Sequence, residues 1–241
     1  MLDNRIVFIH SVDEKTLVPK RLIRYIKIMR SLGYRFVSVK DIMSSNTKKK
    51  CIALTIDDGY KNNIMNLLPI LKKYNVPALL FISTGLLDLP ANDQRLIKTK
   101  CYPDQQMMSH EDVNLWIKEG HEIGFHTHNH VDLYRLDEIT IEKDFRDGMS
   151  VFKNNGWSLK YFAYPFGFIP KNKEHFESLL SEYSFENAFG VTWGKVNPED
   201  AYYVNRVGIG SKEHTLWSVA KSIGLLDRYF FKKRVYKEQI K

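Results

Sequence analysis

Two short segments of this sequence combine residue types that bind metal ions and transfer protons. In the first, the adjacent carboxylates Asp57 and Asp58 follow the apolar run CIALTI and precede Gly59. Neighbouring side chains diverge at a strand end, so one carboxylate can bind a metal ion while the other accepts a proton. Either aspartate by itself is also typical of a turn or of a helix N-cap.

The second segment is HTHNH, residues 126–130. His126 and His130 are four residues apart, and a helical turn would align their imidazoles on one face for metal binding. With one carboxylate they would form an open three-ligand set, in which zinc keeps a position for water and polarises a carbonyl oxygen. The alternative is a solvated, histidine-rich loop. We expect His121 to face solvent, and His128 either to support the site or to be exposed.

The elements that must position these residues alternate between strands and helices. Runs rich in β-branched and aromatic residues predict strands at residues 5–10, 36–39, 51–56, 76–82, 121–125, 161–164, 188–192 and 202–209. Apolar residues at helical spacing predict helices near residues 22–32, 64–71, 109–119, 137–154 and 173–183. Repeated βα units of this kind predict an α/β fold with a parallel sheet, open or closed into a barrel.

The candidate residues lie where predicted strands end. Functional residues of parallel α/β folds collect at the carboxyl ends of their strands. Polar or turn-forming residues follow four of the predicted strands, namely His10, the Asp57–Asp58 pair, the His126–His130 segment and Pro165–Gly167. A polar, irregular stretch at residues 88–108 predicts a long loop of the kind that borders a site.

The bulk composition is that of a globular chain. Its 241 residues are 44% hydrophobic and 27% charged and show no internal repeat, which is typical of a single large domain. The formal net charge of +8 favours anionic ligands, but a basic soluble surface is the commoner explanation and no nucleic-acid-binding motif accompanies the charge. We therefore predict no nucleic-acid partner.

The cysteines and the N-terminus bear on where the protein works. Cys51 and Cys101 are widely separated, so we expect neither a disulfide framework nor a thiolate metal site, and both should pack as small apolar residues. The first residues, MLDNRIVFIHSV, lack the basic region and long apolar core of a secretory signal. We expect a soluble, cytoplasmic protein whose oligomeric state the sequence leaves open.

Taken together, three motifs resemble the polysaccharide deacetylases of carbohydrate esterase family four, also called the nodulation-protein homology domain. The matching segments are TIDDGY at residues 55–60, GHEIGFHTHNH at 120–130 and FAYPFG at 162–167. The resemblance extends from about Arg5 to about Ile209. It implies a distorted (β/α)7-type barrel with a metal at the carboxyl-end mouth, formed by residues 1–210 as a single domain.

The resemblance also implies a role for each motif residue. Asp57 would be the general base that deprotonates the attacking water, and Asp58, His126 and His130 would bind the metal. The backbone N–H of Phe166 would help to form the oxyanion hole. Zinc is our first choice of metal, although cobalt, nickel, manganese and ferrous iron accept the same ligands.

Two positions depart from the usual family pattern. Where the third motif normally has an arginine two residues before its proline, this chain has Ala163. Arg206, on a late predicted strand, is our candidate for the group that holds Asp57 ionised; the alternative is a surface arginine. The usual catalytic histidine near the C-terminus is also absent, because no apolar strand leads into His214.

The segment VFIH at residues 7–10 has the form of that missing histidine strand. This arrangement resembles the subgroup that deacetylates poly-N-acetylglucosamine, where the histidine strand has moved to the N-terminus. The resemblance implies His10 as the general acid that protonates the departing amine, and the alternative is a half-buried histidine at a strand end.

The implied activity is removal of N-acetyl groups from an amino-sugar-containing carbohydrate, with release of acetate. Carbohydrate O-deacetylation and a sugar-binding homologue with weakened catalysis are the alternatives. The C-terminal tail, residues 211–241, ends in LLDRYFFKKRVYKEQIK, which alternates aromatic and basic residues. We expect a terminal helix that packs on or flanks the barrel; the same pattern also fits peripheral association with an anionic membrane.

Overall fold

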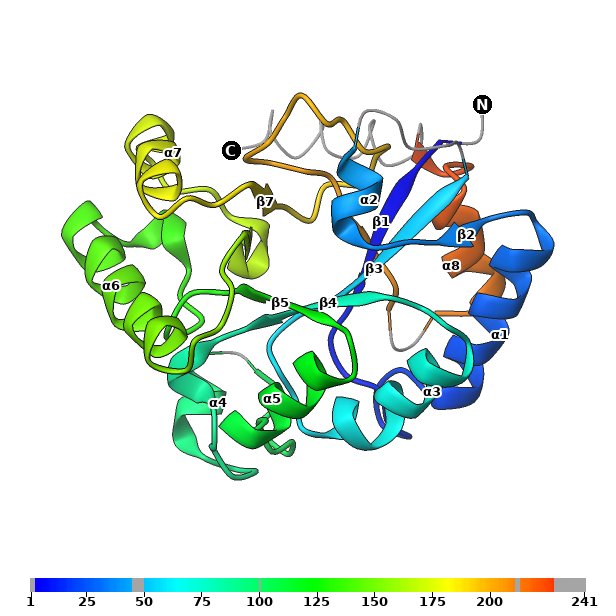
Figure 1. The fold of residues 1–241 in the computed structure, drawn as a ribbon, viewed down its shortest axis with the longest axis horizontal. Helices are drawn as coiled ribbons and strands as arrows, with labels where there is room; N and C mark the ends of the chain where they lie inside the picture. The colour runs from blue at the N-terminus through cyan, green and yellow to red at the C-terminus, as the bar shows by residue number, and fades with distance from the viewer. Residues whose placement is uncertain (1–2, 45–49, 100, 211–212, 228–241) are drawn as a thin grey trace.

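The computed structural model describes residues 3–44, 50–99, 101–210 and 213–227, in which eight strands form one sheet (Figure 1). The strands are β1 (Arg5–Ile9), β2 (Arg35–Phe36), β3 (Cys51–Ile56), β4 (Ala78–Ile82), β5 (Glu122–Phe125), β6 (Tyr161–Ala163), β7 (Asn187–Phe189) and β8 (Val207–Gly208). Their spatial order is β7-β6-β5-β4-β3-β1-β8, with β2 beside β3, and neighbouring strands pair in parallel.

The segment that leads into β8 joins the two ends of this sheet. Val204 pairs with Phe189 of β7, and the N–H of Arg206 donates to the carbonyl of Thr192 at 3.1 Å. A few residues later, the N–H of Ile209 donates to the carbonyl of Phe8 in β1 at 2.9 Å. The seven strands of the main path therefore curl toward closure, as expected for a distorted (β/α)7-type barrel.

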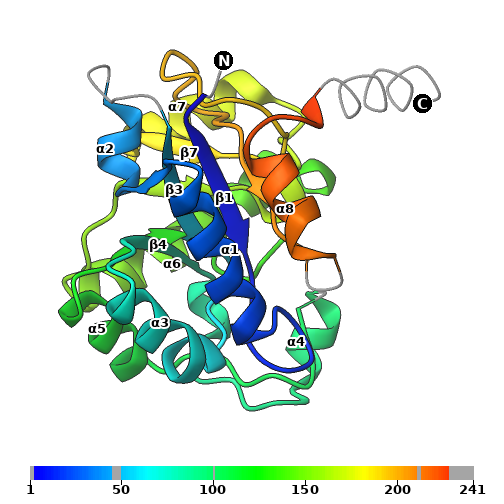
Figure 2. The ribbon, with the colours of Figure 1, turned by 90° about the vertical axis from the view of Figure 1, so that its right-hand side faces the viewer.

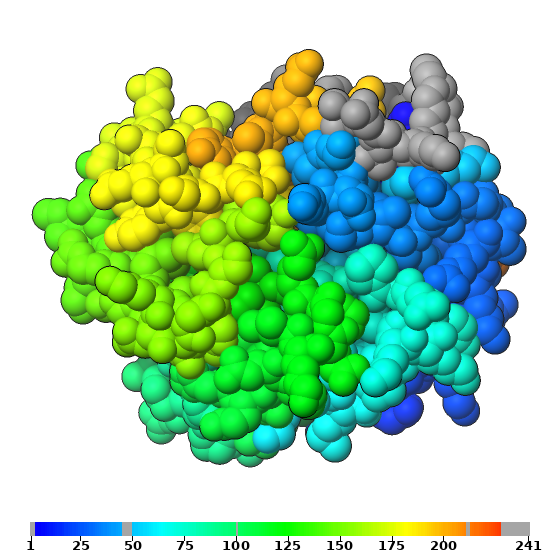
Figure 3. Space-filling view, viewed as in Figure 1, coloured from blue at the N-terminus to red at the C-terminus, as the bar shows by residue number. Residues whose placement is uncertain are grey.

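Most helices cover the outside of the sheet, with α8 lying beside α1 (Figures 1 and 2), whereas α2 packs with Ala53, Leu79 and Phe81 on the inner face. They are α1 (Pro19–Ser31), α2 (Val39–Met43), α3 (Leu68–Lys73), α4 (Gln94–Lys98), α5 (His110–Lys118), α6 (Glu138–Asn154), α7 (Lys173–Glu182) and α8 (Thr215–Ser222). Short turns are η1 (Asn63–Leu67), η2 (Thr84–Leu86), η3 (Leu133–Arg135) and η4 (Pro165–Gly167). Successive segments follow one another around the face seen in Figure 3, as repeated βα units require.

The burial of the central strands follows from their amino-acid composition. All residues of β3 (CIALTI) and β4 (ALLFI) are buried, as expected for parallel strands covered on both faces. The predicted strands near the C-terminus were too long, since residues 188–192 contain only the end of β7 and residues 202–209 contain only β8. β8 still pairs in register with β1, whereas the contact with β7 that closes the barrel is the isolated bridge between Phe189 and Val204.

The predicted C-terminal tail is described only for residues 213–227. Within it, α8 packs on the barrel: Tyr25 of α1 donates its hydroxyl to Ser222 at 2.8 Å, and Arg5 pairs with Asp227 at 2.7 Å. The predicted membrane-associating stretch lies almost entirely beyond the described residues. Among the described ranges, no helix is both long enough and apolar enough to cross a bilayer.

Candidate metal centre and catalytic residues

The carboxyl end of β3 directs Asp57 and Asp58 to different neighbours. Asp57 continues the ladder through its N–H, which donates to the carbonyl of Ile9 at 2.9 Å. Asp58 then adopts φ 78° and Gly59 φ 93°, so the chain turns sharply away from the sheet. Aspartate tolerates the left-handed region better than most residues, and glycine adopts it freely. The turn therefore separates the two carboxylates, as the sequence predicts.

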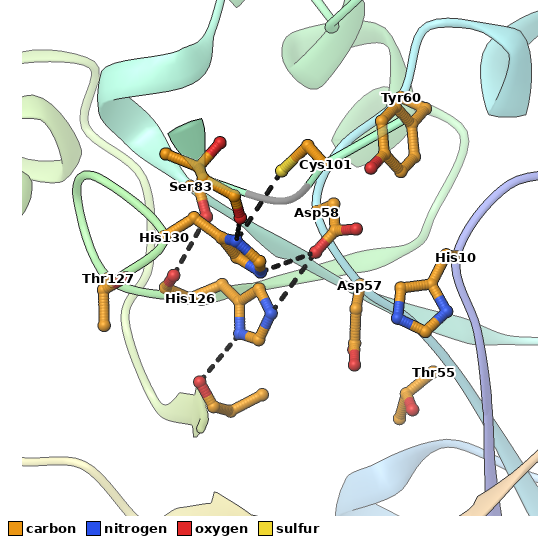
Figure 4. Close-up of polar contacts among 12 residues, drawn as sticks. His10, Thr55, Asp57, Asp58, Tyr60, Ser83, Cys101, His126, Thr127 and His130 are labelled. Carbon is orange, nitrogen blue, oxygen red and sulfur yellow. Dashed lines mark hydrogen bonds and ion pairs between the residues drawn. The ribbon is translucent and has the colours of Figure 1, made fainter. Parts of the chain in front are cut away.

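Asp58, His126 and His130 come together as a buried cluster (Figure 4). Asp58 Oδ1 lies 3.4 Å from His126 Nε2 and 3.2 Å from His130 Nε2. The three candidate ligand atoms all lie within 4.8 Å of one another. The structure therefore brings the three predicted metal ligands together, although they are far apart in the sequence.

The hydrogen bonds of the two histidines test whether this cluster fits a metal ion. His126 Nδ1 bonds the carbonyl of Ala163 at 2.7 Å, and His130 Nδ1 bonds the carbonyl of Thr99 at 2.8 Å. A carbonyl only accepts, so each Nδ1 carries a hydrogen, and Nε2, which faces Asp58, is the nitrogen that would bind a metal. Asp58 Oδ1 is buried and accepts no hydrogen bond among the described residues. Three electron-pair donors thus face one point, which suits a divalent cation.

The conformation of the histidine segment differs from our expectation. Residues 126–130 form a loop rather than a helical turn, and Thr127 and His130 have φ values of 62° and 51°. The imidazoles are aligned by the carbonyls of Ala163 and Thr99, which belong to other parts of the chain. The four-residue spacing was a correct signal for the site, but helical geometry was the wrong reason.

Asp144 of α6 clamps this loop from behind, a role that the sequence did not reveal. Its buried carboxylate accepts from the N–H groups of His128 and Asn129 at 2.6 and 3.0 Å. Burial raises the pKa of Asp144, while the hydrogen bonds from His128 and Asn129 oppose that rise. The clamp holds the loop between the two candidate metal-binding histidines.

Asp144→Ala is expected to weaken zinc binding by about 10- to 100-fold and to lower the free energy of unfolding by about 2–3 kcal/mol, because two buried N–H groups lose their acceptor. Zinc titration calorimetry and urea unfolding measure the two effects. Asp147→Ala is the matched control, since this exposed residue of α6 makes only a 3.9 Å pair with Lys143. Unchanged zinc affinity in Asp144→Ala would contradict the clamp.

Arg206 lies beside Asp57, and the alternative of a surface arginine is wrong. Its Nη1 and Nη2 donate to Asp57 Oδ1 and Oδ2 at 2.7 and 2.9 Å, and its side chain is 0% exposed. Nη1 also donates to Thr55 Oγ1 at 3.1 Å, and Nε donates to the carbonyl of Gly190 at 2.9 Å. The rings of Phe8 and Phe81 cover the guanidinium.

This ion pair controls the charge of Asp57. Burial, the largest single influence, would raise the pKa of Asp57, but the charge and hydrogen bonds of Arg206, together with His126 and His10, lower the pKa below its ordinary value. Asp57 is therefore ionised at neutral pH, as a proton acceptor must be. In this chain Arg206 therefore lies beside Asp57 as its ion-pair partner, whereas Ala163, at the position where the family usually has an arginine, cannot form an ion pair.

His10 is half-buried at the end of β1, beside Asp57 and on the side away from the two clustered histidines (Figure 4). Its ring makes edge contacts with the rings of Phe8 and Tyr102, at centroid distances of 5.6 and 6.4 Å. It also lines a cavity of about 460 Å³ together with Tyr102 and Trp193. Its place beside an open cavity is compatible with proton donation to a leaving group.

Phe166 borders the same site through its ring, which lies 4.8 Å from the His130 ring. Its backbone has φ 59° and ψ 0°, a left-handed conformation that is uncommon for a bulky residue. Strain of this kind clusters at active sites. The participation of its N–H in an oxyanion hole stays a prediction.

The other histidines and cysteines lie at the edge of the site or away from it. His121 is half-buried against the ring of Trp116, so the expectation that it faces solvent was wrong. His128 bonds Thr84 Oγ1 through Nδ1 at 2.9 Å, behind the loop. Both cysteines are free and buried as predicted, and Cys101 Sγ lies 3.6 Å from His130 Nδ1.

Known proteins match both the sequence and the fold. Poly-β-1,6-N-acetyl-D-glucosamine N-deacetylase of Staphylococcus aureus is 26% identical over 191 residues, which cover 76% of this chain and 63% of that protein. The chain thus spans less than two thirds of the length of this curated relative. IcaB from Ammonifex degensii has a TM-score of 0.74 at 22% identity, and the match covers 92% of this chain and 98% of that one.

A second solved structure, the Streptococcus pyogenes deacetylase PplD in complex with acetate, has a TM-score of 0.75 at 18% identity and the same two coverages, 92% and 98%. At these identities the structural likeness establishes the fold. The family itself rests on the sequence, since the polysaccharide deacetylase model matches residues 44–185, more than half of the 241. The chain with this Asp-His-His cluster therefore belongs to the polysaccharide deacetylase family.

Proposed function

We propose that this protein is a metal-dependent hydrolase that removes N-acetyl groups from an amino-sugar-containing carbohydrate and releases acetate. The observation that carries the proposal is the pairing of two features at one strand end. Asp58 belongs to a buried three-ligand cluster, and the adjacent Asp57 is held ionised by Arg206. A cation site next to a charged proton acceptor is an arrangement suited to metal-assisted hydrolysis of an amide.

Each residue would have a separate task in this reaction. Asp57 accepts the proton of the attacking water, and His10 donates a proton to the departing nitrogen from the opposite side. The N–H of Phe166 stabilises negative charge on the acetamide oxygen. When a divalent metal ion is bound by Asp58, His126 and His130, it supplies Lewis-acid polarisation of the acetamide carbonyl.

Zinc is the metal that we propose, because two imidazoles and one carboxylate match its usual catalytic ligand sets. Cobalt, nickel, manganese and ferrous iron bind the same donors and are tested alongside it. For the substrate, the name of the Staphylococcus aureus relative supports β-1,6-linked N-acetylglucosamine oligomers. We also keep a cytoplasmic sugar intermediate, such as a nucleotide-linked N-acetylated sugar, within the proposal.

Removal of the metal is expected to abolish acetate release. The test incubates the protein with N-acetylglucosamine oligomers, nucleotide-linked N-acetyl sugars and O-acetylated sugars, before and after treatment with a chelator. We expect a loss of more than about 100-fold on chelation, with recovery on addition of zinc, because the Lewis acid contributes several kcal/mol. Chelator-insensitive release would contradict the metal site, and release from O-acetyl substrates alone would replace the proposed amide specificity with ester specificity.

A further inference from the structure

Asn63 is a fully buried polar residue that holds the backbone just beyond His10. Its side-chain Nδ2 donates to the carbonyl of His10 at 2.8 Å, and its Oδ1 accepts from the N–H of Val12 at 3.1 Å. The residue is 0% exposed. One amide therefore fixes the chain on both sides of Ser11, at the point where β1 leaves the sheet.

The sheet itself does not extend far enough to hold His10. The register between β1 and β3 ends at Ile9, whose carbonyl accepts from the N–H of Asp57. Among the described residues, the His10 ring makes edge contacts with Phe8 and Tyr102 and no hydrogen bond. Since no side-chain bond orients this ring, its position depends on how the backbone of residues 10–12 is held.

Asn63 is well placed to link His10 to the aspartates. It begins η1, a π-helical turn in which the N–H of Leu68 donates to the carbonyl of Asn63, five residues back. Turns of this kind are rare and occur often at functional sites. Only three residues lie between the Asp58 and Gly59 turn and Asn63, so one short segment sets both the carboxylates and the anchor of His10.

We propose that Asn63 is a positioning residue that holds His10 at the distance from Asp57 at which it protonates the leaving amine. This inference rests on the proposed deacetylase function. A displacement of about 1 Å in a catalytic group can cost about 100-fold in rate. An anchor of the backbone therefore contributes to the rate without touching the substrate.

A comparison of two leaving groups separates this role from a merely structural one. An amine leaves only with a proton, whereas the 4-nitrophenolate of 4-nitrophenyl acetate leaves without one. Asn63→Ala is expected to lower kcat for acetamide hydrolysis by about 10- to 100-fold, with KM and zinc content unchanged, and to lower kcat for the aryl ester by less than about threefold. Equal losses on both substrates would overturn the proposal.

Asn66→Ala is the matched control. Asn66 Nδ2 donates to the carbonyl of Val12 at 2.8 Å, so it bonds the same loop from the same helical segment without touching His10. We expect this variant to retain both activities within about threefold. An amide-selective loss in Asn66→Ala as large as that in Asn63→Ala would assign the effect to general order of the loop.

A double-mutant cycle with His10→Ala gives the decisive result, because residues that act as one unit are non-additive. In the His10→Ala background, Asn63→Ala should change acetamide hydrolysis by less than about twofold. Additive losses would overturn the role of Asn63 while leaving the proposed function intact. A wild-type protein that contains zinc and releases no acetate would instead overturn the proposed function.

Asn63→Asp covers the case in which Asn63→Ala does not fold. It keeps the side-chain volume and the acceptor for the N–H of Val12, but places a carboxylate oxygen against the carbonyl of His10. We expect the same selective loss on the acetamide, and the thermal midpoint reports whether the fold persists. Full acetamide activity in a folded Asn63→Asp protein would also overturn the proposal.

Discussion

Asp57→Asn is expected to lower kcat/KM for acetamide hydrolysis by about 10²- to 10⁴-fold while the protein still binds one zinc ion. An amide side chain cannot take the proton of the attacking water, so the general base is lost. The metal cluster should persist, because the atom that faces His126 and His130 belongs to Asp58. Acetate release and zinc content of the purified variant measure the two outcomes.

The same substitution leaves the buried Arg206 charge without its counter-charge. We therefore expect a lower thermal midpoint for Asp57→Asn, and assays should be run well below that midpoint. Asp147→Asn, an exposed change on α6, controls for a general loss of negative charge. Retention of more than a tenth of the activity by Asp57→Asn, or loss of zinc from it, would contradict the assignment of Asp57 as the base.

Arg206→Met is expected to lower the free energy of unfolding by about 3–5 kcal/mol at neutral pH, because it leaves a buried carboxylate without a partner. The Arg206 and Asp57 side chains are only 0% and 3% exposed, so water does not replace the lost guanidinium. Arg135→Met removes an arginine whose side chain is 76% exposed and that pairs with Asp132, and it should cost less than about 1 kcal/mol. Urea unfolding of both variants measures the difference.

The loss of unfolding free energy in Arg206→Met should become smaller as the pH falls. In the wild type the pKa of folded Asp57 lies below its unfolded value, so its contribution is present above the unfolded pKa and is lost as pH falls through the folded pKa. Without Arg206, burial dominates and raises the folded pKa, so protonation relieves the cost. Unfolding measured at neutral and at mildly acidic pH tests this sign; a difference independent of pH would contradict it.

The pH dependence of catalysis should report the same change in the pKa of Asp57. The acid limb of the kcat/KM profile reflects protonation of the free enzyme's base. In Arg206→Met this limb should move to higher pH, and in Arg206→Lys the movement should be smaller, because lysine keeps the charge but loses the two-point contact with Asp57. An unmoved acid limb in both variants would show that Arg206 does not control the charge of Asp57.

The sequence alone was sufficient for the features that local pattern encodes. The continuous apolar runs of β3 and β4 predict buried parallel strands, and the polar residues directly after strands predict a site at their carboxyl ends. The identities and spacing of the two aspartates, His126 and His130 indicated a metal site, and the family resemblance assigned Asp58 to it. These signals are local because strand type, helix periodicity and turn chemistry depend on neighbours a few residues away.

Only the tertiary structure decided which distant groups support those residues. The sequence left Arg206 open between a partner of Asp57 and a surface arginine; in the structure it reaches Asp57 across 149 residues because the segment before β8 closes the barrel beside β1. Asp144 and Asn63 read in the sequence as ordinary polar helix residues, yet each bonds the backbone of a loop that carries a candidate functional histidine. No local sequence pattern identifies such long-range partners. Their positions depend on how the sheet curls and on the register between strands that are far apart in the sequence.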